Sequence, residues 1–182
     1  PRGASGARTR AVRLPAELGG LDGIVVPGGE STVLDRLARD FGVFAPLREA
    51  VAGGLPVLAT CAGMILCAAE LLDAAAGQRG LGVLDIGVRR NAFGSQLDSF
   101  ETELDVDGIG EGVEAVFIRA PVVARVGGAV RVIATVGDRV VGVRQGAVTA
   151  LSFHPELTAD RRVHRAFVGR VRSRDARPAN LP

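Results

Sequence analysis

Two short apolar runs in the first third of the chain predict buried strands, and each ends in a turn of small residues. Residues 21–26 read Leu-Asp-Gly-Ile-Val-Val and stop at Pro27-Gly28-Gly29, while residues 55–60 lead into Cys61-Ala62-Gly63. The spacing of apolar residues between these runs predicts an amphipathic helix with Ser31 as its N-cap. The apolar positions at i, i+3, i+4 and i+7 are Leu34, Leu37, Ala38 and Phe41.

Three further elements are predicted around these segments. Residues 11–14 are expected to form a short strand, and Phe44, Leu47 and Val51 mark a short helix. After the cysteine, the apolar run 64–72 is expected to be helical. Strands that alternate with helices in this way are typical of an α/β protein.

The second half of the chain changes to short alternating segments separated by turn residues such as Gly127-Gly128. The predicted strands are residues 82–88, 99–106, 113–119, 130–136, 139–144 and 148–153. A final amphipathic helix is predicted from Val163, Ala166, Phe167 and Val171. The whole pattern predicts one α/β domain over residues 1–182, a doubly wound sheet with an added β-rich portion. Residues 1–10 are expected to be a frayed lead-in and residues 172–182 a loose tail.

Composition narrows the function classes. The chain has 182 residues, 47% of them hydrophobic, which fits a folded domain with a sizeable core. Its 22 basic residues are all Arg and are scattered among 20 acidic residues, and no Trp or Tyr is present for base stacking. These features argue against nucleic-acid binding. The apolar runs are too short for a membrane span, and the Arg-rich start lacks the apolar stretch of a signal peptide.

Cysteine usage indicates a reducing compartment. The two cysteines, Cys61 and Cys67, fall in one segment at a spacing that suits neither a disulfide nor a zinc-binding pair. No metal site is expected, and a cytoplasmic location is the simplest interpretation.

Cys61 stands where a predicted strand turns sharply into a predicted helix. This geometry presents a side chain at the end of the sheet, as in the nucleophile elbow of α/β hydrolases. The helix N-terminus behind it favours negative charge, which suits an oxyanion. The position of Cys61 therefore indicates a nucleophile.

A cysteine nucleophile needs a base, and the chain has two histidines. His164 lies among arginines in the last predicted helix and is expected to be a solvated helix residue. His154 follows an apolar strand and precedes Pro155, which favours extended backbone. Positions i and i+2 of extended backbone share a side, so Glu156 is expected beside His154, where it would orient the imidazole. The alternative interpretation of His-Pro-Glu is an ordinary turn.

The turn at residues 27–31 offers backbone donors. Its two glycines let the backbone come close to a ligand. The N–H of Gly29 and the N–H of Ala62 are expected to form an oxyanion hole. The simpler interpretation is a strand-to-helix turn with a serine cap.

Five motifs occur in a fixed order along the chain: Pro-Gly-Gly-Glu-Ser-Thr (27–32), Thr-Cys-Ala-Gly-Met (60–64), Arg-Asn-Ala-Phe-Gly (90–94), Phe-Ile-Arg-Ala-Pro (117–121) and Ser-Phe-His-Pro-Glu-Leu (152–157). In this order they resemble the glutaminase subunits of pyridoxal 5'-phosphate synthases, a family of class I glutamine amidotransferases. The resemblance covers roughly residues 11–171 and implies a flavodoxin-like α/β fold.

The resemblance implies an enzyme that hydrolyses L-glutamine to L-glutamate and ammonia. Cys61 would be the nucleophile, His154 the general base and acid, and Glu156 the residue that orients His154. The residues implied to contact glutamine are Gly29, Glu30, Ser31, Arg90, Ile118 and Arg119. The resemblance further implies a hetero-oligomer in which ammonia passes to a synthase subunit for pyridoxal 5'-phosphate (vitamin B6) synthesis. This chain itself would hold no cofactor.

The sequence departs from the family at its start. Family members open with a central strand, a Leu-Gln-Gly loop and a first helix, none of which is found before residue 11. The absent strand is expected to leave two strand edges exposed beside the catalytic residues. Smaller departures are Ala59, Arg89 and Ser95, where the family more often has Gly, an acidic residue and Arg.

Two alternatives stay open. A glutaminase domain of another amidotransferase, serving imidazole glycerol phosphate or nucleotide synthesis, would share Cys61, His154 and Glu156 but not the Phe-Ile-Arg-Ala-Pro motif. A non-catalytic remnant that still binds a partner would account for the absent strand.

Overall fold

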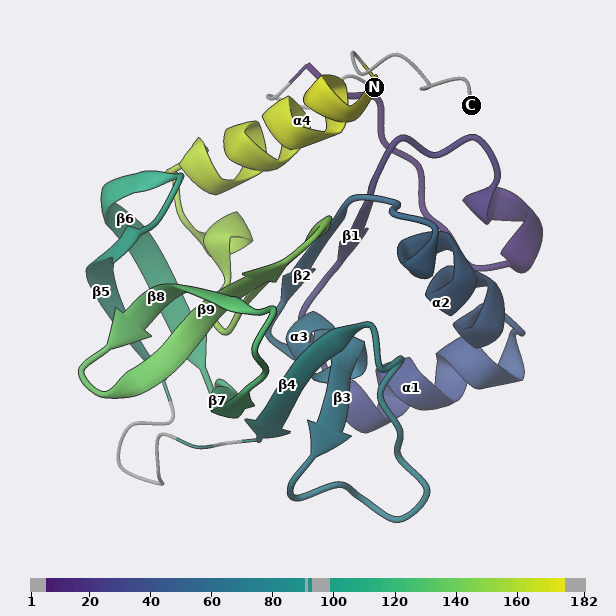
Figure 1. Ribbon diagram of the computed structural model, residues 1–182, viewed down its shortest axis with the longest axis horizontal. Coiled ribbons are helices and arrows are strands. Elements are labelled where there is room, and N and C mark those ends of the chain that lie inside the picture. The colour runs from purple at the N-terminus through teal and green to yellow at the C-terminus, as the bar shows by residue number, and fades with distance from the viewer. Residues whose placement is uncertain (1–5, 91, 93–98, 176–182) are drawn as a thin grey trace.

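The computed structural model describes residues 6–90, 92 and 99–175. Within these residues the main sheet has the strand order β1-β2-β10-β9-β7-β4-β3, with β8 paired to β9 (Figure 1). Its strands are β1 (Ile24–Val26), β2 (Val57–Thr60), β3 (Ala68–Leu71), β4 (Leu84–Arg89), β7 (Val122–Val126), β8 (Arg131–Val136), β9 (Arg139–Gln145) and β10 (Val148–Leu151). A separate hairpin is formed by β5 (Ser99–Val106) and β6 (Gly110–Ile118).

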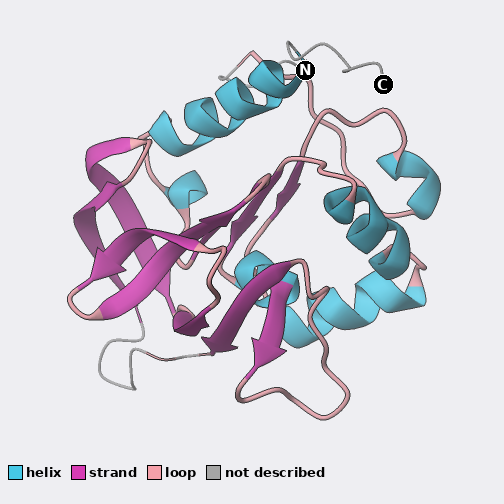
Figure 2. Cartoon of the chain, in the orientation of Figure 1, coloured by secondary structure: helices cyan, strands magenta, loops and turns pink. Residues whose placement is uncertain are grey.

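Helices cover both faces of the parallel strands (Figure 2). They are α1 (Ser31–Asp40), α2 (Phe44–Ala52), α3 (Ala62–Cys67) and α4 (Arg162–Asp175), with 3₁₀ turns η1 (Pro15–Leu18) and η2 (Pro155–Leu157). Val57 and Ala59 of β2 pack in one core with α1, α2 and α3, and Leu58 packs in the other with α4 and the hairpin. Because successive strand residues face opposite sides, β2 is buried on both faces. The predicted α/β fold is confirmed. No helix in the described part of the chain is long and apolar enough to span a membrane.

Parallel pairing brings the ends of three strands to one edge of the sheet. β2 pairs in parallel with both β1 and β10, and the register sets Val26 beside Ala59 and Thr60 beside Leu151. In open α/β sheets, ligands bind outside the carboxyl ends of the strands. The residues that follow β1, β2 and β10 therefore start from the edge where a site is expected.

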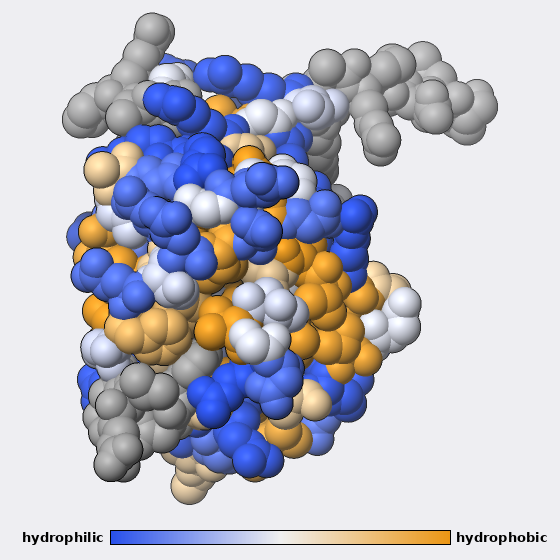
Figure 3. Space-filling model, turned by 90° about the vertical axis from the view of Figure 1, so that its left-hand side faces the viewer, coloured by the Kyte–Doolittle hydropathy of each residue, from blue (hydrophilic) through white to orange (hydrophobic). Residues whose placement is uncertain are grey.

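The β-rich portion lies beside this sheet. The β5–β6 hairpin is joined to β8 by a hydrogen bond from the Asp107 N–H to the Ile133 carbonyl (2.8 Å). Its ring contacts run from Phe100 through Phe117 to Phe153, with centroid distances of 4.6 and 5.6 Å. The outer face on this side mixes hydrophilic and hydrophobic residues (Figure 3). The added β-rich portion expected from the sequence is thus present as a hairpin that packs against the end of β10.

Most predicted strands and helices are confirmed to within a few residues, two predictions are wrong, and one strand was not predicted. Residues 11–14 form no strand; they lead irregularly into the η1 turn and pair with no strand of the described residues. The helix predicted over 64–72 ends at Cys67, and Ala68–Leu71 forms strand β3 beside β4. A short apolar run of this kind fits a helix or a strand. Where the helix ends and β3 begins, the backbone N–H of Leu81 donates to the Leu66 carbonyl (2.6 Å). Strand β7 was not predicted, because its short run follows Pro121 without clear alternation.

The sheet is open at β1, which in the described residues pairs only with β2. Val25 on this strand is 47% exposed, and Val33, Leu37 and Phe41 of α1 are 41%, 43% and 54% exposed. We call these four side chains the β1–α1 edge. The buried residues of α1 are instead Ser31 and Asp35. The predicted apolar stripe is therefore divided: Leu34 packs against the core, whereas Leu37 and the C-cap residue Phe41 are exposed.

Candidate active site

Cys61 occupies a sharp turn between β2 and α3. Its φ of 47° and ψ of −106° are rare for a residue with a side chain, and such strain costs about 1–3 kcal/mol. The turn is held by the Cys61 N–H, which donates to the Leu151 carbonyl of β10 (2.8 Å). The Cys61 carbonyl accepts from the N–H of Met64 (3.0 Å) and of Ile65 (3.3 Å). The predicted elbow is therefore present, with the cysteine 7% exposed.

Two glycines make this turn possible. A Cβ on Gly63 would overlap the Val26 carbonyl, so α3 can lie against β1 only with glycine there. A Cβ on Gly28 would overlap the imidazole of His154 and would lie 3.3 Å from the Cβ of Cys61. Sequence reasoning did not single out Gly28. The feature that could have indicated its role is its place as the first glycine of Pro-Gly-Gly, directly after β1, which runs parallel to β2.

His154 reaches the elbow after β10 has ended. The Ser152 N–H bonds the Val141 carbonyl and the His154 N–H bonds the Val116 carbonyl of β6, both at 2.8 Å. His154 Nδ1 lies 2.7 Å from Glu156 Oε1. The predicted pair is thus in contact, but the predicted extended backbone is wrong. Pro155 begins the η2 turn, and this turn folds the carboxylate back to the ring.

The electrostatics of His154 follow from its two neighbours. A hydrogen bond with the Cys61 side chain, then one with Glu156, raises the pKa of His154 to about 9, against the opposing effect of burial. Burial works to raise the pKa of Glu156, but the hydrogen bond from His154 and nearby charges outweigh it and lower that pKa. With Nδ1 held by Glu156, Nε2 is the nitrogen left to face the thiol. The three side chains form one contact chain.

The other cysteine and the other histidine lie outside this chain of contacts. Cys67 is a fully buried free thiol, and burial raises its pKa to about 12. The prediction of a solvated His164 is wrong in part. Its Nδ1 is buried without a hydrogen-bond partner among the described residues, because the side chain lies half-buried in the first turn of α4. Burial, and then Arg161, lower the pKa of His164.

The turn after β1 opens α1 in a way that differs from the prediction. Ser31 is the first residue of the helix, and Glu30 is the N-cap. The Glu30 carboxylate accepts from the N–H of Thr32 (3.2 Å), from the N–H of Val33 (2.9 Å) and from the Thr32 hydroxyl. The Glu30 side chain thus fills the capping role that was predicted for Ser31. Ser31 is buried and its hydroxyl accepts from Gln78 Nε2 (3.1 Å).

The two candidate oxyanion donors lie on either side of the elbow. Gly29 has a φ of 140°, a conformation that favours glycine, and space for a side chain around it is open. Ala62 is the first residue of α3, and the first N–H groups of a helix have no acceptor within the helix. Both N–H groups therefore suit a bound oxyanion.

Arg90 follows the end of β4 and is held by Asp73. Its backbone N–H donates to both Asp73 carboxylate oxygens at 3.0 Å, and its Nη2 donates to the Asp73 carbonyl at 2.7 Å. Its charge also contributes to lowering the pKa of Glu30, behind the hydrogen bonds from Thr32. Arg90 is therefore within electrostatic reach of the turn at residues 28–31.

Ile118 ends strand β6 and Arg119 follows it, two and three residues beyond the Val116 carbonyl that holds His154. Ile118 is 38% exposed, and Arg119 is exposed with a φ of 44°. The Ala92 N–H bonds the Ala120 carbonyl (3.2 Å), which ties this corner to the segment after Arg90. Ser95 and most of the 90–94 motif lie outside the described residues.

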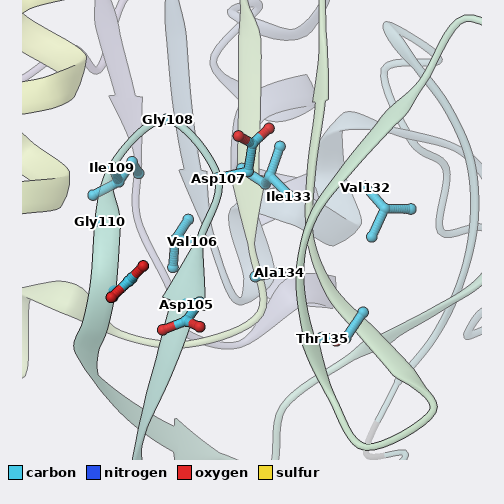
Figure 4. Close-up of a pocket in the computed structure, with 11 residues that line it drawn as sticks. Asp105, Val106, Asp107, Gly108, Ile109, Gly110, Val132, Ile133, Ala134 and Thr135 are labelled. Carbon is cyan, nitrogen blue, oxygen red and sulfur yellow. The ribbon is translucent and has the colours of Figure 1, made fainter.

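A separate hollow of about 730 Å³ lies between the β5–β6 turn and β8 (Figure 4). It is lined by Asp105, Val106, Asp107, Gly108, Ile109, Gly110, Glu111, Val132, Ile133, Ala134 and Thr135. None of these is a candidate catalytic or glutamine-binding residue. The chemistry therefore belongs to the elbow and not to this hollow.

The chain is similar to known proteins in both sequence and fold. A family model described as the SNO glutamine amidotransferase family matches residues 3–173. The pyridoxal 5'-phosphate synthase subunit PdxT of Cutibacterium acnes is 61% identical, over 91% of this chain and 86% of the relative. The PdxT subunit of Clavibacter sepedonicus is 59% identical, over 91% and 80%. A crystal structure of a glutamine amidotransferase matches with a TM-score of 0.86 and 48% identity, over 91% of this chain and 87% of that one.

Proposed function

The chain belongs to the SNO glutamine amidotransferase family, and from this premise we propose that it is the glutaminase subunit of a pyridoxal 5'-phosphate synthase. It hydrolyses L-glutamine to L-glutamate and ammonia. The observation that carries the proposal is the contact chain from Cys61 through His154 to Glu156 at the carboxyl ends of β2 and β10. The names of the relatives at 59–61% identity favour this synthase over the other amidotransferases.

The first half-reaction forms a thioester. His154 accepts the Cys61 proton, and the thiolate sulfur attacks the side-chain amide carbon of glutamine. The N–H groups of Gly29 and Ala62 hold the oxyanion as the carbonyl becomes tetrahedral. The protonated imidazole then gives its proton to the amide nitrogen, which leaves as ammonia. The pKa of His154, raised to about 9 by Cys61 and Glu156, makes the imidazole basic enough to hold the proton taken from Cys61 until the amide nitrogen accepts it.

The second half-reaction releases glutamate. With ammonia gone, neutral His154 takes a proton from water, whose oxygen attacks the thioester carbon. Collapse of the second tetrahedral intermediate breaks the carbon–sulfur bond, and the proton on His154 returns to the sulfur. Glu156, 2.7 Å from Nδ1, keeps the ring oriented and stabilises its charged form throughout.

The substrate's amino-acid end is the part that distinguishes glutamine from a simple amide. Arg90 and Arg119 supply the positive charge for its α-carboxylate. Gly29, Glu30, Ser31 and Ile118 complete the proposed contacts. Since the Glu30 carboxylate is occupied as the cap of α1, its contribution to glutamine binding falls to its backbone.

We further propose that residues 1–182 act as one glutaminase domain in the cytoplasm. Its ammonia passes to a synthase subunit bound to it, and this chain needs no cofactor of its own. Copurification of the chain with that synthase subunit tests the partnership.

The catalytic proposal is tested by ammonia release from L-glutamine with the synthase subunit present. Cys61→Ala should lower the rate by at least about a thousandfold, as expected for loss of a nucleophile. Cys67→Ala is the matched control, since that thiol is buried away from the contact chain. Full activity of Cys61→Ala would overturn the mechanism. A cooperative thermal melt shows that each variant is folded. A cooperative melt of the wild type together with glutamine-dependent labelling of Cys61 would exclude the alternative of a non-catalytic remnant.

A further inference from the structure

The segment between β3 and β4 touches two separate parts of the proposed glutamine site. It spans residues 72–83 and contains none of the sequence motifs. At one end Asp73 holds Arg90, and near its middle Gln78 holds Ser31. Arg90 follows β4 and Ser31 opens α1, so these two candidates come from different elements of the fold.

Asp73 holds Arg90 through three hydrogen bonds. Both carboxylate oxygens accept from the backbone N–H, and the Asp73 carbonyl accepts from Nη2. The carboxylate also lies 3.6 Å from Nε, while the Arg90 side chain is 23% exposed. A guanidinium has five N–H donors, and Asp73 engages only part of this set. Within the described residues, no hydrogen bond engages the remaining donors on Nη1 and Nη2, which can bind a carboxylate in the paired geometry that arginine favours.

Gln78 fixes the other side of the site. Its Nε2 donates to the Ser31 hydroxyl (3.1 Å), while its Oε1 accepts from the Ala75 N–H (3.2 Å). The Gln78 N–H bonds the Ala75 carbonyl (3.0 Å), so the turn that carries this side chain is closed on itself. The Gly77 carbonyl accepts from Arg39 of α1 (2.8 Å), which adds a second tie between this turn and the helix.

From these contacts we infer that Asp73 and Gln78 are positioning residues for glutamine. The 72–83 segment sets the distance between Arg90, the proposed partner of the α-carboxylate, and Ser31, a proposed glutamine contact from a different element. The inference rests on the proposed function and deepens it. It assigns recognition of the amino-acid end of the substrate to a segment that touches neither Cys61 nor His154 in the recorded contacts.

The test separates substrate recognition from nucleophile chemistry. Asp73→Asn keeps the shape of the side chain and removes its charge, and in the complex with the synthase subunit it should raise the KM for glutamine about tenfold while kcat changes less than about twofold. Gln78→Ala should shift KM in the same direction by a smaller factor. Asp85→Asn is the matched control. Asp85 lies on β4, the strand that leads to Arg90, but its carboxylate pairs with the exposed Arg125 (2.9 Å). Its KM should equal that of the wild type.

A second readout uses two reagents for Cys61. Iodoacetamide carries no amino-acid group and should label Asp73→Asn at the wild-type rate. The glutamine analogue 6-diazo-5-oxo-L-norleucine carries that group and should inactivate Asp73→Asn about tenfold more slowly. Equal inactivation rates and equal KM values in wild type and Asp73→Asn would overturn the inference alone. A wild-type complex that releases no ammonia and is not inactivated by the analogue would overturn the proposed function, and this inference with it.

Discussion

The cysteine elbow and the β1–α1 edge share strand β1 but are packed in opposite ways. At the elbow, Gly28 and Gly63 have no room even for a methyl group. At the edge, Val25, Leu37 and Phe41 each leave between 43% and 54% of their surface exposed. The side of β1 that faces the elbow therefore fixes the positions of Cys61 and His154, whereas its exposed side contributes little to that geometry. The comparison predicts that identical substitutions have very different effects in the two regions.

The largest effect is expected at Gly28. A methyl group there overlaps the ring of His154, and a displacement of about 1 Å at a reacting group can cost a hundredfold in rate. Gly28→Ala should lower kcat/KM for ammonia release by about a hundredfold or more, measured with the synthase subunit bound. Gly169→Ala, the same substitution in an open position of α4, should leave the rate unchanged. Near-normal activity of Gly28→Ala would mean that the elbow is looser than its packing indicates.

A pair of leucines compares core with edge directly. Leu47 of α2 is 4% exposed, so Leu47→Ala should lower the free energy of unfolding by about 2–5 kcal/mol. Leu37 of α1 is 43% exposed, so Leu37→Ala should cost less than about 1 kcal/mol. Denaturant unfolding of both variants measures the difference. Equal costs would show that the β1–α1 edge is covered in solution.

The smallest of the three effects is a shift in titration within the elbow. Glu156→Gln removes a charge and weakens a hydrogen bond that favours imidazolium, so the pKa of His154 should fall from about 9 toward its ordinary value of 6.5. Titration of the imidazole signals by NMR measures it. An unchanged pKa in Glu156→Gln would show that Cys61 alone sets the charge of His154.

The same shift makes stability depend on pH. A histidine whose pKa is raised by folding stabilises the protein fully below its unfolded value of 6.5, and this contribution is lost as the pH rises through about 9. The free energy of unfolding of the wild type should therefore fall between these pH values more than that of Glu156→Gln. Parallel curves for the two proteins would count against the contact.

Patterns within one segment were enough to predict much of the fold. The buried strands at residues 21–26 and 55–60 and the helix around Leu47 each have a clear apolar run or period, and the structure confirms them. Strand β3 was predicted as helix because its residues fit both structures, and only pairing with β4 decides between them. The sequence of β3 alone, or of β4 alone, does not indicate that the two segments pair.

The candidate site divides in the same way. Cys61 could be identified because it stands where a predicted strand turns into a helix. His154 could be identified because the chain has only two histidines. The contact between His154 and Glu156 was predicted, although by the wrong backbone geometry. Gly28, Asp73 and Gln78 were missed, since each acts on a residue from a different element. Such cross-element contacts have no local period or motif to reveal them.

The β2–β10 pairing determines when the enzyme can become active during its synthesis. Cys61 lies in the first half of the chain and His154 near its end, and the Leu151 carbonyl that holds the Cys61 N–H belongs to the last strand. Synthesis delivers the N-terminal part first, and pairing between distant segments is slow to form. A nascent chain therefore carries an unpartnered thiol until β10 docks. Glutaminase activity should begin only when nearly the whole chain has emerged from the ribosome.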